Sequence, residues 1–171
     1  MSLLLFMIRV PDDVAQEMVM LARLLRRGYG LVNWTYDAAR LHVTLFELGD
    51  HVDLPPRLVD AASRAAASVR AAPFEVTFDR LEAWADALVL RCDDGSSPLT
   101  MLRAQLGAML KRVGLDHRSD FTPHVSLMRG ATPVEAQQVK AFRWTVEAVA
   151  LVNSLSGHGK YVELGRWPLR S

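Results

Sequence analysis

The chain has 171 residues, of which 50% are hydrophobic, so it is long enough to bury the core of one compact domain. Its 20 basic and 19 acidic residues give a net charge of +1, which argues against a dedicated high-affinity duplex binder with a dominant basic face. Cys92 is the only cysteine, which excludes an intramolecular disulfide and a cysteine-based metal cluster and makes a reducing compartment the simpler assumption. The apolar run at 3–8 ends at Arg9, before a membrane span is reached, so we expect a cytoplasmic protein without a membrane anchor.

The first part of the chain predicts a strand, a helix and a second strand. The apolar run at 3–8 is the first strand, and Pro11 opens a helix whose apolar residues recur with helical spacing as far as Leu25. After a loop, residues 41–45 alternate between aliphatic and polar, which is typical of a strand with one buried face.

The rest of the chain predicts further elements of the same kinds. In order, the patterns indicate a helix at 55–71, strands at 74–78 and 87–92, a helix at 97–113, a strand at 121–127, a short helical piece from 132, a strand at 143–153 and a closing strand at 160–165. Residues 2–78 and 87–153 then share one order of elements, which an internal duplication explains economically. We expect a single α+β domain over residues 1–171, with two pseudo-symmetric lobes around a central groove, each lobe an antiparallel sheet with outer helices.

Two of the predicted strands carry nearly the same sequence. Leu-His-Val-Thr-Leu at 41–45 recurs as Pro-His-Val-Ser-Leu at 123–127. In each strand the histidine and the hydroxyl residue share one face, and side chains two apart on a strand lie about 6.6 Å from each other. If the two strands meet, the groove contains two imidazoles and two hydroxyls. These four residues are His42, Thr44, His124 and Ser126.

Three kinds of chemistry could use such a pair of histidines. A metal site normally needs three or four protein ligands, and the best third ligand beside these strands is Asp50 or His51, so we expect no metal. A serine–histidine nucleophile needs the hydroxyl and the base in contact and an acidic residue to orient the ring, whereas each hydroxyl here flanks its own histidine. Acid–base chemistry on a phosphate needs a base at the attacking oxygen and an acid at the leaving oxygen, and histidine, with a pKa of about 6.5, can serve as either. We favour this third interpretation.

The two H-x-[ST]-L motifs, the second within Phe-Thr-Pro-His-Val-Ser-Leu at 121–127, resemble those of the two-histidine (2H) phosphoesterase superfamily. Within it the chain is most similar to the bacterial 2′-5′ RNA ligases, also described as RNA 2′,3′-cyclic phosphodiesterases. The similarity extends to Pro-Asp-Asp at 11–13, Leu-Gly-Asp at 48–50 and the segment 154–169. The resemblance implies an enzyme without metal or cofactor that hydrolyses 2′,3′-cyclic phosphate ends of RNA or small nucleotides, with 2′-5′ ligation as the same chemistry run backwards.

The resemblance also implies roles for individual residues. By position, His42 matches the family's proton donor to the leaving ribose oxygen and His124 the acceptor that activates water, although the two motifs alone do not distinguish acid from base. Thr44 and Ser126 match the phosphate-binding hydroxyls, with Ser in the second motif where Thr is common. Arg129 matches a basic residue often seen in relatives and is a further candidate for phosphate binding.

Aromatic residues near the strands are candidates for stacking on a nucleobase, although aromatics at strand ends are more often part of the core. They are Trp34, Phe46, Phe121 and Tyr161. The remaining histidines, which are His51, His117 and His158, are expected to be structural.

Two further alternatives are left open by the residues. The groove could bind RNA or nucleotides without turnover, because a fold can persist without its chemistry. The direction of the reaction, the size of the substrate and the base preference have no signature in the sequence. We expect a monomer, given the near-neutral charge and the length of a single domain.

Overall fold

The computed structural model describes residues 1–118, 120–155 and 159–171, and within these ranges the chain forms eight strands, three α-helices and one 3-10 helix. The strands are β1 (Ser2–Arg9), β2 (His42–His51), β3 (Phe74–Ala83), β4 (Ala87–Arg91), β5 (His124–Arg129), β6 (Gln137–Val146), β7 (Ala148–Leu155) and β8 (Lys160–Pro168). The helices are α1 (Asp12–Gly28), the 3-10 helix η1 (Ala38–Arg40), α2 (Pro56–Ala67) and α3 (Ser97–Arg112). No helix in the described ranges is long and apolar enough to cross a membrane.

The strands form one antiparallel sheet in the order β6-β3-β4-β5-β2-β1-β7-β8. The predicted α+β class with antiparallel strands is therefore confirmed. At the centre of the sheet, β2 and β5 are paired only through Val43 and Val125. This narrow junction divides the sheet into two four-stranded halves, β6-β3-β4-β5 and β2-β1-β7-β8.

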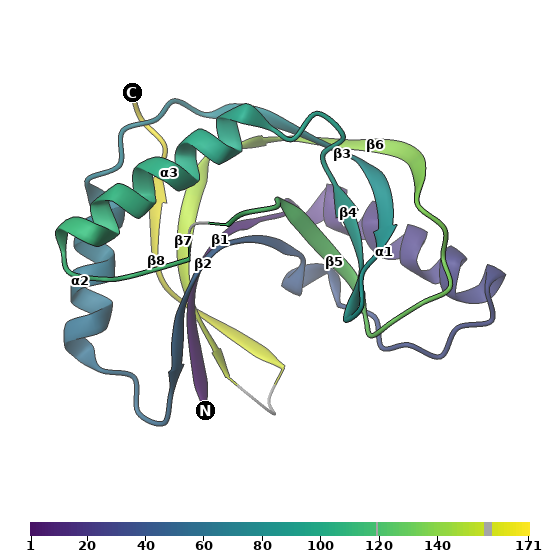
Figure 1. Ribbon diagram of the computed structural model, residues 1–171, viewed down its shortest axis with the longest axis horizontal. Coiled ribbons are helices and arrows are strands. Elements are labelled where there is room, and N and C mark those ends of the chain that lie inside the picture. The colour runs from purple at the N-terminus through teal and green to yellow at the C-terminus, as the bar shows by residue number, and fades with distance from the viewer. Residues whose placement is uncertain (119, 156–158) are drawn as a thin grey trace.

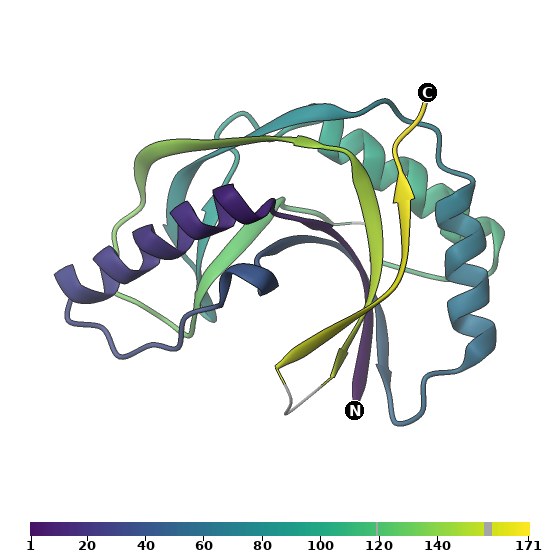
Figure 2. The same ribbon diagram turned by 180° about the vertical axis from the view of Figure 1, so that it is seen from behind.

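The two halves do not follow the order of the chain. The half β2-β1-β7-β8 combines the first two strands with the last two, whereas the other half contains the consecutive strands β3 to β6. Figures 1 and 2 show the sheet bent into an arc, with α2 and α3 on the first of these halves and α1 on the second. The contacts agree, since α1 packs on β5 and β6 while α2 packs on α3, β7 and β8. Each half is thus covered by at least one helix.

All three helices pack on the same face of the sheet. The main core joins residues of α1 and α3 to the aliphatic residues of the central strands, Val43 and Val125 among them. Since side chains alternate along a strand, the polar residues that flank these valines point to the opposite face. A smaller cluster on that opposite face, made of Leu5, Met7, Ala150 and Val152, explains why β1 is apolar throughout.

Two predicted elements are wrong. The short helix expected from Thr132 does not form, because Asn33 Nδ2 donates hydrogen bonds to the carbonyls of Arg129 and Ala131 and holds this segment in an irregular conformation. The single strand expected at 143–153 is two strands, β6 and β7, which lie in different halves of the sheet. The internal duplication of residues 2–78 and 87–153 stays a prediction.

Candidate active site

The junction between β2 and β5 brings the two histidine strands together. Because Val43 lies opposite Val125 in an antiparallel pair, the register places His42 across from Ser126 and Thr44 across from His124. All four side chains are half-buried and share the face without helices. Diagonal neighbours on antiparallel strands are about 7–8 Å apart. The two imidazoles therefore occupy one diagonal of a small quadrilateral, and the two hydroxyls occupy the other.

Backbone carbonyls fix the orientation of both imidazole rings. His42 Nδ1 lies 2.7 Å from the carbonyl of Arg40, and His124 Nδ1 lies 2.9 Å from the carbonyl of Thr122. A carbonyl oxygen only accepts, so Nδ1 must carry the proton in each ring. Nε2 is left as the reactive nitrogen. In His42 it lies 3.1 Å from Thr44 Oγ1, so the expectation that this hydroxyl only flanks its histidine is wrong. Both histidines are thus oriented by the carbonyl of the residue two positions earlier.

An aromatic ring contacts each histidine. Trp84, which follows β3 in the connection to β4, packs at a tilt on His124 with 4.4 Å between ring centroids. Tyr161 of β8 lies edge-on to His42 at 5.5 Å. Such contacts restrict the rotation of the imidazoles and reduce their contact with water.

The pKa of His42 is lowered from its ordinary value to about 4, chiefly by burial and also by the positive charges of Arg9, His124 and Arg40. The hydrogen bond to the Arg40 carbonyl acts on this pKa in the opposite direction. His42 is therefore neutral at neutral pH. The positive charges of Arg9 and Arg40 favour the binding of an anion beside the ring.

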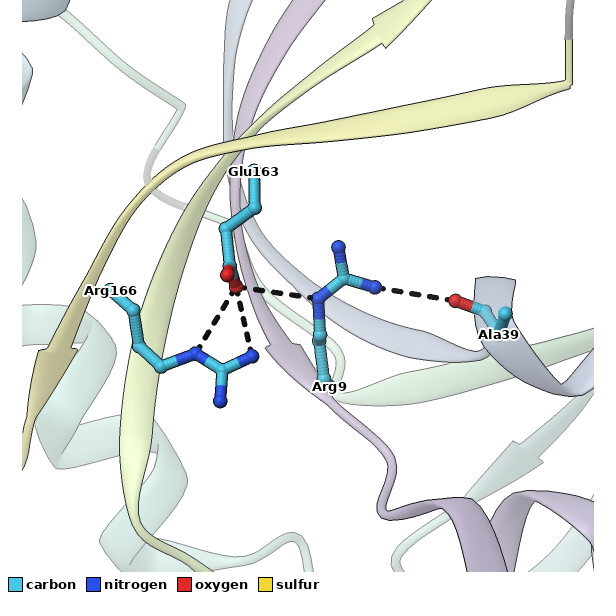
Figure 3. Close-up of polar contacts among 4 residues, drawn as sticks. All are labelled: Arg9, Ala39, Glu163 and Arg166. Atoms are coloured by element: carbon cyan, nitrogen blue, oxygen red, sulfur yellow. Dashed lines mark hydrogen bonds and ion pairs between the residues drawn. The ribbon is translucent and has the colours of Figure 1, made fainter.

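Arg9 is held in place beside His42 by an ion pair and a hydrogen bond (Figure 3). Its Nε lies 3.6 Å from Glu163 Oε1, and its Nη1 donates a hydrogen bond of 3.2 Å to the carbonyl of Ala39. Arg166 donates to the same oxygen of Glu163 from Nε at 3.2 Å and from Nη2 at 3.0 Å. These contacts tie β1, β8 and η1 together at one end of the quadrilateral.

A cleft of about 480 Å³ opens beside the quadrilateral on the side of His124. Its walls come from β2, the connection between β3 and β4, helix α3 and the segment before β5. Among the residues that line it are Thr44, Phe46, Trp84, Arg103, Phe121, His124 and Ser126. Two hydroxyls and an imidazole therefore face a space that can accommodate a small ligand.

The sequence model of the 2′-5′ RNA ligase superfamily matches residues 10–158, which is most of the chain. The chain belongs to this superfamily. No curated protein sequence matches it. Among solved structures, it is similar to E. coli LigT in apo form, at 25% identity over 99% of this chain and 98% of that chain with a TM-score of 0.82. LigT complexed with 3′-AMP matches at 23% identity over 98% of each chain with a TM-score of 0.83, and TT0787 of Thermus thermophilus at 21% over 98% of each with a TM-score of 0.81.

Arg103 of α3 is a member of the cleft that the sequence analysis missed. It is buried, and its guanidinium lies 4.2 Å from the ring centre of Phe46 and 4.9 Å from that of Phe121. Its Nε donates to the carbonyl of Leu45 and its Nη2 to that of Arg118. Burial lowers the pKa of Arg103. A charged residue between apolar residues on the buried face of the helix is a signal that could have identified it.

Trp84 was also missed, because no repeated pattern includes it. Its ring contacts His124 of β5, which is distant from Trp84 in the sequence. In this 2′-5′ RNA ligase superfamily member, the tertiary structure therefore adds Trp84 and Arg103 to the candidate site.

The four aromatic residues proposed to stack on a nucleobase lie in different places. Phe121 lines the cleft, and Phe46, which is 3% exposed, packs between Arg103 and His117. Tyr161 contacts His42 on the other side of the quadrilateral. Trp34 is 46% exposed and packs against Tyr36 with 4.8 Å between ring centroids. Their stacking on a nucleobase stays a prediction.

Arg129 is exposed at the end of β5, and its guanidinium lies 5.5 Å from the ring centre of Trp34. It is absent from the walls of the cleft. Its phosphate-binding role stays a prediction, as do the roles of the two histidines and the two hydroxyls.

Two of the remaining histidines, His51 and His117, bond to backbone carbonyls outside the quadrilateral. His51 Nε2 lies 3.1 Å from the carbonyl of Leu48, and the two ring nitrogens of His117 lie 3.0 Å from the carbonyls of Gly107 and Arg118. His158 lies outside the described residues. In the described part of the chain, no three His, Cys, Asp or Glu side chains are grouped in a way that could hold a metal ion.

Proposed function

We propose that this superfamily member is a phosphodiesterase that hydrolyses 2′,3′-cyclic phosphate ends of RNA or small nucleotides. The observation that carries the proposal is the quadrilateral at the junction, in which the two imidazoles occupy one diagonal and the two hydroxyls the other. In the proposed complex the phosphorus atom lies between the two imidazoles. In-line displacement requires this arrangement, since the attacking and leaving oxygens lie on opposite sides of phosphorus.

In the proposed reaction one histidine removes a proton from water as the water oxygen attacks phosphorus. The other histidine donates a proton to the ribose oxygen as its bond to phosphorus breaks. The products are a ribose hydroxyl and a phosphate monoester, and the two histidines have exchanged protonation states. A departing oxygen that is protonated does not require a metal to stabilise it.

We assign the donor role to His42 and the acceptor role to His124, following the superfamily resemblance. Because His42 is neutral at neutral pH, it must take up its proton together with the substrate anion, whose charge opposes the effect of Arg9 and Arg40 on the ring. Substrate binding is then accompanied by proton uptake.

We assign to the hydroxyls of Thr44 and Ser126 the donation of hydrogen bonds to the non-bridging phosphate oxygens. Charge develops on these oxygens in the transition state, so donors fixed on the sheet stabilise it without reorganisation. A ligand of this class also agrees with the similar structures, since E. coli LigT was crystallised with 3′-AMP, ATP and NADP+.

The test is hydrolysis of adenosine 2′,3′-cyclic phosphate in the presence of a metal chelator. His42→Ala and His124→Ala are each expected to lower kcat by at least about 10²-fold, because each removes one proton transfer. His51→Ala, which alters a histidine outside the site, is expected to retain activity. Activity retained in either site variant contradicts the mechanism. Binding of the substrate by the wild-type chain without turnover supports instead a nucleotide-binding module.

A further inference from the structure

Arg40 presents its guanidinium to a group of aromatic rings beside the candidate active site. Its Cζ lies 5.2 Å from the ring centre of Trp34, 5.5 Å from that of Tyr36 and 4.9 Å from that of Tyr161. In the described ranges Arg40 forms no ion pair with a carboxylate, and its buried Nε has no hydrogen-bond partner. A half-buried guanidinium whose charge no carboxylate balances favours the binding of an external anion.

The aromatic rings hold Arg40 without occupying its hydrogen-bond donors. Rings attract a guanidinium through their faces, whereas the five N–H groups lie in the plane of the guanidinium and bind carboxylate or phosphate oxygens. Arg9 shows the contrasting case, since it lies close to the same histidine but forms an ion pair with Glu163 (Figure 3). Of these two arginines, Arg40 is therefore the one whose N–H groups are available to bind an external anion.

The position of Arg40 relates it directly to the reaction. Its carbonyl accepts the Nδ1–H of His42, and its guanidinium is separated from that imidazole by one side chain, Tyr161, which contacts both. Arg129 adds a second positive charge, with its guanidinium 5.5 Å from the ring centre of Trp34. The cleft at Trp84 and Phe121 lies on the side of His124 instead, so the two regions flank the quadrilateral.

We propose that Arg40, held by Trp34, Tyr36 and Tyr161 and assisted by Arg129, forms a second phosphate subsite that binds the 5′-phosphate of the terminal nucleotide. This inference rests on the proposed function. When a 2′,3′-cyclic phosphate occupies the quadrilateral, the 2′ and 3′ oxygens of that ribose are used, so any second phosphate of the substrate is attached through O5′. The subsite therefore selects substrates that carry a 5′-phosphate or a preceding nucleotide over simple cyclic mononucleotides.

The experiment compares two small substrates that differ only at O5′. These are adenosine 2′,3′-cyclic phosphate and its 5′-phosphorylated form. The wild-type chain is expected to show a kcat/KM about tenfold or more higher for the 5′-phosphorylated substrate, the magnitude of one charge-assisted bidentate contact. In Arg40→Gln this ratio is expected to fall to near one, and in Arg40→Lys, which keeps a charge without the planar fork, to an intermediate value.

Arg143→Gln is the matched control, because Arg143 is an exposed arginine on the edge strand β6. It is expected to keep the wild-type ratio, and thermal unfolding of each variant verifies that it is folded. A wild-type ratio near one, or the same ratio in Arg40→Gln as in wild type, overturns the subsite while the proposed function remains.

If the wild-type chain hydrolyses neither substrate, the proposed function fails and calorimetry tests the subsite separately. Adenosine 3′,5′-bisphosphate is then expected to bind about tenfold more tightly than adenosine 3′-monophosphate to wild type, and with equal affinity to Arg40→Gln. Equal binding of the two nucleotides to wild type overturns the subsite in that case.

Discussion

His42 gives the stability of the fold a dependence on pH. The pKa of its imidazole is about 4 in the folded chain and about 6.5 in an unfolded chain. Between these values the unfolded state binds more protons, so the free energy of unfolding is highest above pH 6.5 and decreases as the pH falls towards 4. The decrease attributable to this ring is on the order of 2–3 kcal/mol.

Urea denaturation of wild type and His42→Gln at pH 7.5, 5.5 and 4 measures this contribution. The glutamine variant, which cannot titrate, is expected to lose less stability over this range than wild type. An identical loss in both chains would mean that the imidazole is not held in its neutral form by the fold.

The site residues that could be identified from the sequence are those that belong to a repeated local motif. The four members of the quadrilateral were found because a histidine and a hydroxyl two positions apart occur twice on strands with the same alternation. Trp84, Arg103 and Arg40 were not found as site residues. Trp84 and Arg103 reach the site through contacts between elements that are distant in sequence, and Arg40 is close to His42 in the chain but contacts Tyr161 of β8. The repeated motif includes none of these three residues.

At the scale of elements, helix α3 packs tightly against His117 and Phe46 at Gly107. A Cβ at Gly107 would lie 2.9 Å from His117 Nε2 and 3.1 Å from Phe46 Cζ. His117 Nε2 also lies 3.0 Å from the Gly107 carbonyl, so this contact holds His117 against α3. The helix tolerates the lower propensity of glycine here because a larger residue would displace the ring.

Gly107→Ala is therefore expected to destabilise the chain by about 1–3 kcal/mol, through overpacking against His117 and Phe46. Gly28→Ala in α1 is the matched control, because nothing lies within 4 Å of the added Cβ, and it is expected to be neutral or stabilising by up to about 1 kcal/mol. Midpoints of chemical denaturation measure both. If Gly107→Ala were as harmless as the control, the contact with His117 would not constrain the helix.

Helices and strands could be predicted where the hydrophobic residues followed a single period. The places where one element ends and the next begins could not. The alternation at 143–153 runs through the exposed Glu147 without a break, so two strands in different halves resembled one. Pro133, after Thr132, suggested the start of a helix. Instead, the side-chain amide of Asn33, which is distant in sequence, donates hydrogen bonds to two backbone carbonyls of that segment. The assignment of helices to halves depends on tertiary packing, which local spacing does not encode.

In the whole molecule, one core spans the narrow junction of the sheet. The main cluster of buried residues includes Phe6 and Leu151 from one half and Phe78 and Phe142 from the other. Only one residue pair joins β2 to β5, so the shared core under the helices, rather than the sheet, couples the halves. We expect the chain to unfold as one cooperative unit.

Tryptophans at the two edges of the sheet can test this coupling. Trp144 lies in β6 and Trp167 in β8, which are the opposite edge strands. In two variants that each retain one of these tryptophans, with the other three replaced by Phe, fluorescence and circular dichroism are expected to give coincident midpoints in urea. A difference between the fluorescence and circular dichroism midpoints within one variant would mean that the halves unfold separately.

The strand order also bears on how the protein is made by the ribosome. The second neighbour of β1 in the sheet is β7, which is synthesised near the end of the chain. The consecutive strands β3 to β6 can pair as soon as they leave the exit tunnel, whereas the half that holds His42 must wait for the carboxy-terminal hairpin. A nascent chain therefore completes the half that holds His42 last, and translation that stops before β7 leaves the first strand with one side unpaired.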